Sequence, residues 1–140
     1  RDYPRRARRA LIVIDASAVV DLLLQVPDAA AIEARLVGSR GGLHAPHLID
    51  VEIASVLRRQ TAKGEIDAHR GHATLADLAD FPLIRYPHAP LLPRLWQLRH
   101  TLTAYDAAYV ALAEALDAPL ITRDRRLAAA TGHRAKVEVI

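Results

Sequence analysis

The pattern of hydrophobic and polar positions divides the chain into two kinds of segment. Short apolar runs rich in β-branched residues, such as 11–14 and 119–122, are typical of strands buried on both faces of a parallel sheet. Longer segments with a helical spacing of apolar residues, bounded by capping residues, glycines and prolines, lie between them. Strands are predicted at residues 11–14, 43–45, 83–86, 119–122 and 137–140.

Helices are predicted at residues 16–24, 28–37, 48–62, 67–79, 89–100, 104–116 and 124–130. Asp28 and Asp67 are expected to cap the second and the fourth of these helices. The helix at 89–100 is expected to pack through one face, formed by Trp96, Leu92, Leu95 and Leu98 or Arg99. The alternation of strands and helices predicts an α/β fold: a three-layer α/β/α sandwich around a central parallel sheet of four or five strands.

The positive charge is concentrated at the start of the chain. The 140 residues carry a formal net charge of +3. Residues 1–9 hold five arginines and one aspartate, a net charge of +4, so the remainder carries −1. We therefore expect a basic extension or expression remnant at 1–9 and a single domain at 10–140. The basic composition alone does not indicate a nucleic-acid-binding domain.

Missing residue types and motifs exclude several classes of protein. The chain has no cysteine, which excludes disulfides, thiolate zinc sites, iron–sulfur clusters and a cysteine nucleophile. No apolar run approaches the ~20 residues that span a bilayer, and no signal peptide is recognisable. The phosphate-binding motifs GxxxxGK and GxGxxG are absent. The pairs His44 with His47 and His69 with His72 lack the further ligands that zinc requires.

Four acidic residues lie next to predicted apolar strands or on or near the apolar faces of predicted helices. Asp15 directly follows the first strand, and Asp124 follows the fourth with one residue between. Asp106 lies on the helical stripe that also carries core residues, and Glu52 lies close to the apolar face of its helix. A buried carboxylate costs several kcal/mol unless it is paired, hydrogen-bonded or bound to a metal ion.

Each acid also has an ordinary structural explanation. Asp15 and Asp124 could cap helices, Asp106 could interact with a helix dipole, and Glu52 could pair with an arginine in the following turns. Together, however, the four acids are expected at the carboxyl edge of one sheet, where ligands bind in such folds. Clustered carboxylates repel one another, and Mg²⁺ or Mn²⁺ would neutralise them. The four acids therefore predict metal-assisted hydrolysis of a phosphodiester bond.

Four stretches carry a family resemblance: IVIDASAVVDLLL, DVEIASVLRR, TAYDAAYVALAEAL and LITRDRRLA. In this order and spacing they resemble the PIN domain and, more narrowly, the VapC toxins of bacterial VapBC toxin–antitoxin pairs, over residues 11–140. The resemblance implies a Mg²⁺-dependent endoribonuclease that leaves a 5′-phosphate and a 3′-hydroxyl, with Mn²⁺ as a possible substitute. Its catalytic acids would be Asp15, Glu52, Asp106 and Asp124.

The resemblance also implies roles for individual residues. Asp15 and Asp106 would be the main metal ligands, and Glu52 and Asp124 would bind the ion directly or through water. Two hydroxyl groups, on Ser17 and Thr122, would support them.

Three arginines flank the last acid, namely Arg123, Arg125 and Arg126. They could bind the RNA backbone, because arginine contacts phosphate through two parallel hydrogen bonds, or they could form a solvated helix face. The resemblance implies an RNA substrate, a VapB antitoxin, a homodimer or larger complex, no membrane and a bacterial cytoplasmic location. The sequence does not identify which RNA is cleaved.

Two other classes of protein share some of these sequence features. A phosphotransfer enzyme or receiver also has an aspartate after the first strand, but a phosphatase requires a second aspartate where Ser17 stands. A receiver requires a lysine after a late strand, and none lies near residues 119–126. A non-catalytic PIN-like module that binds RNA or a protein is the closer alternative, although all four acids are present.

Overall fold

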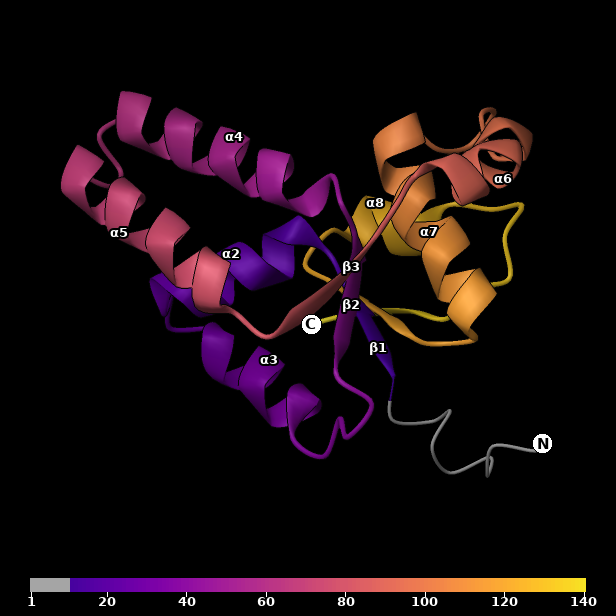
Figure 1. Ribbon diagram of the computed structural model, residues 1–140, viewed down its shortest axis with the longest axis horizontal. Helices are drawn as coiled ribbons and strands as arrows, with labels where there is room; N and C mark the ends of the chain where they lie inside the picture. The colour runs from indigo at the N-terminus through magenta and orange to yellow at the C-terminus, as the bar shows by residue number, and fades with distance from the viewer. Residues whose placement is uncertain (1–10) are drawn as a thin grey trace.

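Five parallel strands form the central sheet of the computed structural model, which describes residues 11–140 (Figure 1). Their order across the sheet is β3-β2-β1-β4-β5. The strands are β1 (Ile12–Ile14), β2 (Leu43–Pro46), β3 (Leu83–Tyr86), β4 (Leu120–Thr122) and β5 (Val137–Val139). The five predicted strands are confirmed to within one residue at each end. The predicted extension at 1–9 lies outside the described residues.

The first strand is the centre of the sheet. All three residues of β1 are buried, and Val13 pairs with His44 of β2 on one side and with Leu120 of β4 on the other. The neighbouring β2 and β4 are also buried along their length, whereas the edge strands β3 and β5 are partly exposed. This distribution agrees with the uninterrupted apolar sequence of β1, the strand at the centre of the sheet.

Helices cover both faces of the sheet. Figure 1 shows α2, α3, α4 and α5 on one side of the strands and α6, α7 and α8 on the other. Their bounds are α2 (Ala16–Leu24), α3 (Ala29–Leu36), α4 (Ile49–Ala62), α5 (Ala68–Asp80), α6 (Leu92–Gln97), α7 (Ala104–Leu116) and α8 (Arg125–Ala129). The predicted three-layer α/β/α sandwich is confirmed. None of the helices in residues 11–140 is both long and apolar enough to cross a membrane.

The prediction for residues 89–100 is wrong in two respects. A 3₁₀ turn at Ala89–Leu91 precedes the short helix α6, because the prolines in this segment lack the N–H donors of a continuous helix. The core-facing stripe is Leu91, Leu95 and Leu98, at the spacing i, i+4 and i+7. Trp96 lies off this stripe and is 69% exposed. Its indole ring instead stacks with the guanidinium of Arg99, 4.5 Å from the ring centroid.

The two predicted aspartate caps have different outcomes. Asp67 accepts a hydrogen bond from the backbone N–H of Arg70 at 2.7 Å, which confirms it as the cap of α5. Asp28 stands at the start of α3 but makes no capping hydrogen bond. Its carboxylate binds Arg123 instead, 95 residues further along the chain.

Candidate active site

The sheet topology brings together segments that are far apart in the sequence. Because β1 and β4 are parallel neighbours, with Ile14 paired to Ile121, the residues that follow them emerge at the same edge. Asp15 follows β1, and Asp124 follows β4. The other two acids lie in first turns of helices: Glu52 in α4 and Asp106 in α7. The four predicted acids therefore come from four separate segments.

Asp15 is a buried carboxylate with hydrogen bonds to both of its oxygens. The Ser17 hydroxyl donates to Oδ1 at 2.6 Å, and the backbone N–H of Ala18 donates to the same oxygen at 3.2 Å. The hydroxyl of Thr122 donates to Oδ2. Asp15 is thus a helix cap, as its ordinary explanation required, and also part of the acidic cluster. Burial raises its pKa despite these hydrogen bonds, and the charge of Asp106 adds to the rise.

Glu52 is held by a tyrosine from the opposite helix layer. The hydroxyl of Tyr109 on α7 donates to Glu52 Oε1 at 2.6 Å. Burial raises the pKa of Glu52, and the charges of Asp106 and Asp15 raise it further. No ion pair joins Glu52 to an arginine in residues 11–140, so its ordinary explanation is wrong.

The hydrogen bond between Tyr109 and Glu52 was not predicted from the sequence. Tyr109 is indeed buried, at 2% exposure. A buried tyrosine hydroxyl needs a hydrogen-bond partner, and this requirement was the available signal. Its position three residues after Asp106 put it on the same stripe, but the sequence could not identify the acceptor.

Asp106 and Asp124 differ in their electrostatic surroundings. Burial raises the pKa of Asp106, and the charge of Asp124 raises it further. The pKa of Asp124 is lowered, chiefly by its hydrogen bond with the Arg126 guanidinium. Asp124 Oδ1 also accepts the backbone N–H of Arg126 at 2.9 Å, so Asp124 caps α8 as well. Asp124 is therefore the best neutralised of the four acids.

The four carboxylates form one electrostatic cluster with Asp106 in the middle. The charge of Asp106 raises the pKa of Asp15 and of Glu52, and it is itself affected by Asp124. Asp15, Glu52 and Asp106 make no ion pair with any residue from 11 to 140. Nor are three or more histidine, aspartate or glutamate side chains of this described region gathered as ready-made metal ligands. The negative charges of Asp15, Glu52 and Asp106 are therefore not balanced by an ion pair within this part of the chain.

The three arginines around Asp124 occupy different environments. The guanidinium of Arg123 forms ion pairs with Asp21 and Asp28. Arg126 pairs with Asp124 at 3.3 Å. The side chain of Arg125 is exposed and forms no ion pair within the described region.

The buried histidine of the first predicted pair has a structural role. His44 lies in β2, with Nδ1 2.7 Å from the hydroxyl of Tyr86 and Nε2 2.7 Å from the carbonyl oxygen of Gly41. Both ring nitrogens are therefore occupied by protein groups.

Comparisons with known proteins identify the family of this chain. Residues 12–132 match the PIN domain family. Ribonuclease VapC12 of Mycobacterium tuberculosis is 43% identical over 130 residues, which cover 93% of this chain and 99% of the relative. Ribonuclease VapC1 of the same organism is 46% identical over 129 residues, covering 91% of this chain and 96% of the relative.

Solved structures show the same fold. PAE2754 from Pyrobaculum aerophilum superimposes with a TM-score of 0.66 at 26% identity, covering 93% of this chain and 85% of that one. VapBC2 from Rickettsia felis, solved with a DNA fragment from its promoter, gives a TM-score of 0.68 at 13% identity. That match covers 92% of this chain and 98% of the other. This chain belongs to the PIN domain family and, within it, to the VapC group of the VapBC toxin–antitoxin systems.

Proposed function

We propose that this protein is a metal-dependent endoribonuclease toxin of a type II toxin–antitoxin pair. It would hydrolyse RNA phosphodiester bonds with Mg²⁺, or with Mn²⁺ in its place. The relatives in the VapC group carry the name ribonuclease. The observation that carries the proposal is the group Asp15, Glu52 and Asp106: the charge of Asp106 raises the pKa of the other two, and none of the three forms an ion pair in the described region.

The donor atoms fit a hard divalent cation. All four acids offer carboxylate oxygens, which Mg²⁺ and Mn²⁺ prefer. Magnesium is usually bound through one or two carboxylates, with water and substrate phosphate completing its coordination. In this proposal Asp15 and Asp106 bind the ion directly, and Glu52 and Asp124 bind it directly or through water.

The protein's own residues would orient the reacting groups. A bound Mg²⁺ supplies a water molecule of lowered pKa and positive charge at the phosphate. Ser17 and Thr122 hold the Asp15 carboxylate in one orientation, and Tyr109 does the same for Glu52. The exposed Arg125 would bind the RNA backbone beside the site, since a guanidinium contacts phosphate through paired N–H groups. Cleavage would leave a 5′-phosphate and a 3′-hydroxyl.

The family also supports a partner. We infer a VapB-type antitoxin, since VapBC2 of Rickettsia felis is a structural relative over nearly the whole chain. A homodimer, within a larger toxin–antitoxin complex in the bacterial cytoplasm, belongs to the same proposal.

Cleavage of end-labelled total RNA tests the proposal directly. The purified protein, freed of antitoxin, is incubated with Mg²⁺, Mn²⁺ or EDTA. Discrete fragments with 5′-phosphates are expected only with a metal ion, and Asp106→Asn should lower cleavage by at least 100-fold. Asp77→Asn is the matched control, because Asp77 is exposed and forms no ion pair in the described region.

Two results would contradict the proposal. Cleavage that persists in EDTA or in Asp106→Asn would show that these carboxylates do not form the active site. Retention of RNA without any cleavage, in protein shown to be free of antitoxin, would support the non-catalytic binding module instead.

A further inference from the structure

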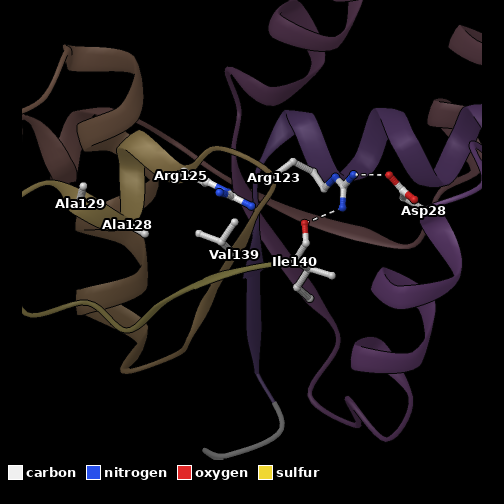
Figure 2. A pocket seen from close by; sticks show the side chains of 7 residues that line it. All are labelled: Asp28, Arg123, Arg125, Ala128, Ala129, Val139 and Ile140. Carbon is white, nitrogen blue, oxygen red and sulfur yellow. Dashed lines mark hydrogen bonds and ion pairs between the residues drawn. The ribbon is translucent and has the colours of Figure 1, made fainter.

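The side chain of Arg123 is engaged on three sides by the protein. Its Nε lies 2.9 Å from Asp21 Oδ2, and its Nη2 lies 3.1 Å from Asp28 Oδ2. Its Nη1 donates to the backbone oxygen of Ile140 at 2.5 Å. Figure 2 shows the contacts with Asp28 and Ile140 at one side of an open pocket of about 790 Å³. The guanidinium thus joins α2, the turn before α3 and the end of the chain after β5.

The backbone of the same residue is joined to the acidic site. The N–H of Arg123 donates to Ser17 Oγ at 3.0 Å, and Ser17 in turn donates to Asp15. The neighbouring Thr122 donates to the other oxygen of Asp15 and accepts the backbone N–H of Asp124 at 2.9 Å. The segment 122–124 therefore makes three contributions to the site. Thr122 donates a hydrogen bond to Asp15, the backbone of Arg123 donates one to the Ser17 hydroxyl, and Asp124 is itself one of the four acids.

Arg123 contacts two residues of α2, Ser17 and Asp21, which lie on one side of that helix. Ser17 and Asp21 are four residues apart, so they lie one turn apart on the same face. Arg123 binds the first through its backbone and the second through its side chain. This double attachment fixes the position of residues 122–124 against α2. Each of the three guanidinium nitrogens also contacts a protein oxygen already, so a phosphate bound through two parallel hydrogen bonds would compete with these partners.

We propose that Arg123 is a positioning residue of the carboxylate site and not an RNA contact. By holding 122–124 against α2, it keeps the hydroxyl groups of Ser17 and Thr122 on the two oxygens of Asp15. The orientation of Asp15 toward a metal ion then depends on the ion pair between Arg123 and Asp21. This inference rests on the proposed function, in which Asp15 is a metal ligand. It assigns the RNA contact at this edge to Arg125, which Figure 2 shows beside the same pocket with no dashed contact.

Metal binding and RNA binding, measured separately, test the inference. Mn²⁺ affinity is measured by calorimetry on protein without RNA, and RNA retention is measured in EDTA. Arg123→Ala should weaken Mn²⁺ binding about tenfold and change RNA retention by less than twofold. Asp21→Asn should reproduce the loss, and the double variant should be no worse than either single one, since both remove one interaction. Arg123→Lys, which keeps the charge but not the three-sided contact, should fall between.

Arg125→Ala is expected to give the opposite pattern, with weaker RNA retention and wild-type Mn²⁺ affinity. Arg40→Ala is the matched control for loss of one positive charge, because Arg40 is exposed and forms no ion pair in the described region. Circular dichroism verifies that each variant is folded. If Arg123→Ala does not fold, Asp21→Asn and Arg123→Lys carry the same comparison.

The inference is overturned if the Arg123 variants keep wild-type Mn²⁺ affinity. It is equally overturned if Arg123→Ala loses RNA retention as Arg125→Ala does, which would make Arg123 an RNA contact. Failure of the proposed function gives a different result. In that case the wild-type protein binds no Mn²⁺, or binds it as well after Asp106→Asn.

Discussion

Buried side chains orient the acids of the site by donating hydrogen bonds to them. Tyr109 is the clearest case, because its ring is buried among core residues while its hydroxyl reaches Glu52 at 2.6 Å. A hydrogen bond to a charged group contributes about 1.5–3 kcal/mol. The Tyr109 hydroxyl oxygen contacts the site, whereas its ring packs in the core. Removing this oxygen therefore tests the hydrogen bond to Glu52 while leaving the packing of the ring in place.

Tyr109→Phe keeps the ring and removes only the hydroxyl. We expect the cleavage rate and the Mn²⁺ affinity each to fall about tenfold, since Glu52 loses the bond that fixes its orientation. Tyr105→Phe is the matched control, because Tyr105 is 66% exposed and its hydroxyl makes no hydrogen bond in the described region. Wild-type activity in Tyr109→Phe would show that Glu52 does not require this hydrogen bond.

Pairs of elements are joined by buried charges away from the acidic site. Glu114 on α7 accepts two hydrogen bonds from Arg94 of α6, at 2.8 and 2.9 Å, and one from the backbone of Arg134 at 3.0 Å. The Glu114 side chain is only 2% exposed. The short helix α6 contributes few buried residues of its own, so this ion pair is its main polar attachment to α7.

Glu114→Gln should lower the free energy of unfolding by about 2–3 kcal/mol at pH 7, because a charged hydrogen-bonded pair is broken. The hydrogen bond with Arg94 lowers the pKa of Glu114 below its ordinary value of 4.5. The stabilisation is therefore complete above pH 4.5 and is lost as the pH falls through the lower folded-state pKa. Urea unfolding of both proteins between pH 3 and pH 7 measures the difference.

Glu33→Gln is the matched control, because Glu33 is exposed and forms no ion pair in the described region. A difference between wild type and Glu114→Gln that stays constant down to pH 3 would exclude the ionised carboxylate as its source.

The acidic site is expected to lower the free energy of unfolding of the whole molecule when no metal ion is bound. Burial raises the pKa of Asp15, Glu52 and Asp106, so each of them is costly to ionise in the metal-free protein. Active sites commonly contain groups that lower the stability of the folded protein but are required for activity. A bound cation would remove much of this cost and stabilise the folded state through linkage.

Asp106→Asn is expected to raise the melting temperature of the metal-free protein by about 2–4 °C, equivalent to roughly 1 kcal/mol. Saturating Mn²⁺ should raise the melting temperature of the wild type by several degrees and leave that of Asp106→Asn nearly unchanged. Thermal unfolding with Mn²⁺ and with EDTA measures both effects. A lower melting temperature for metal-free Asp106→Asn would contradict this account of the cluster.

The sequence by itself determined the architecture of this protein. Apolar runs and helical spacing are local signals, so they gave the five strands, the parallel α/β arrangement and most helix bounds. The same signals placed Asp15 and Asp124 at strand ends, and the four motifs in order indicated the family. Local signals failed at 89–100, where prolines shortened the helix and where Trp96 lies off the buried stripe.

Only the tertiary structure decided which groups contact the acids. Thr122 binds Asp15 across 107 positions of the chain, and Tyr109 binds Glu52 across 57. Arg123 contacts Asp28 across 95 positions, whereas the local sequence predicted Asp28 as the cap of α3. Such partners are set by the order of strands in the sheet and by the packing of helices over its edge. Periodicity along the chain records which face a residue occupies, but it carries no information about the residue that meets it there.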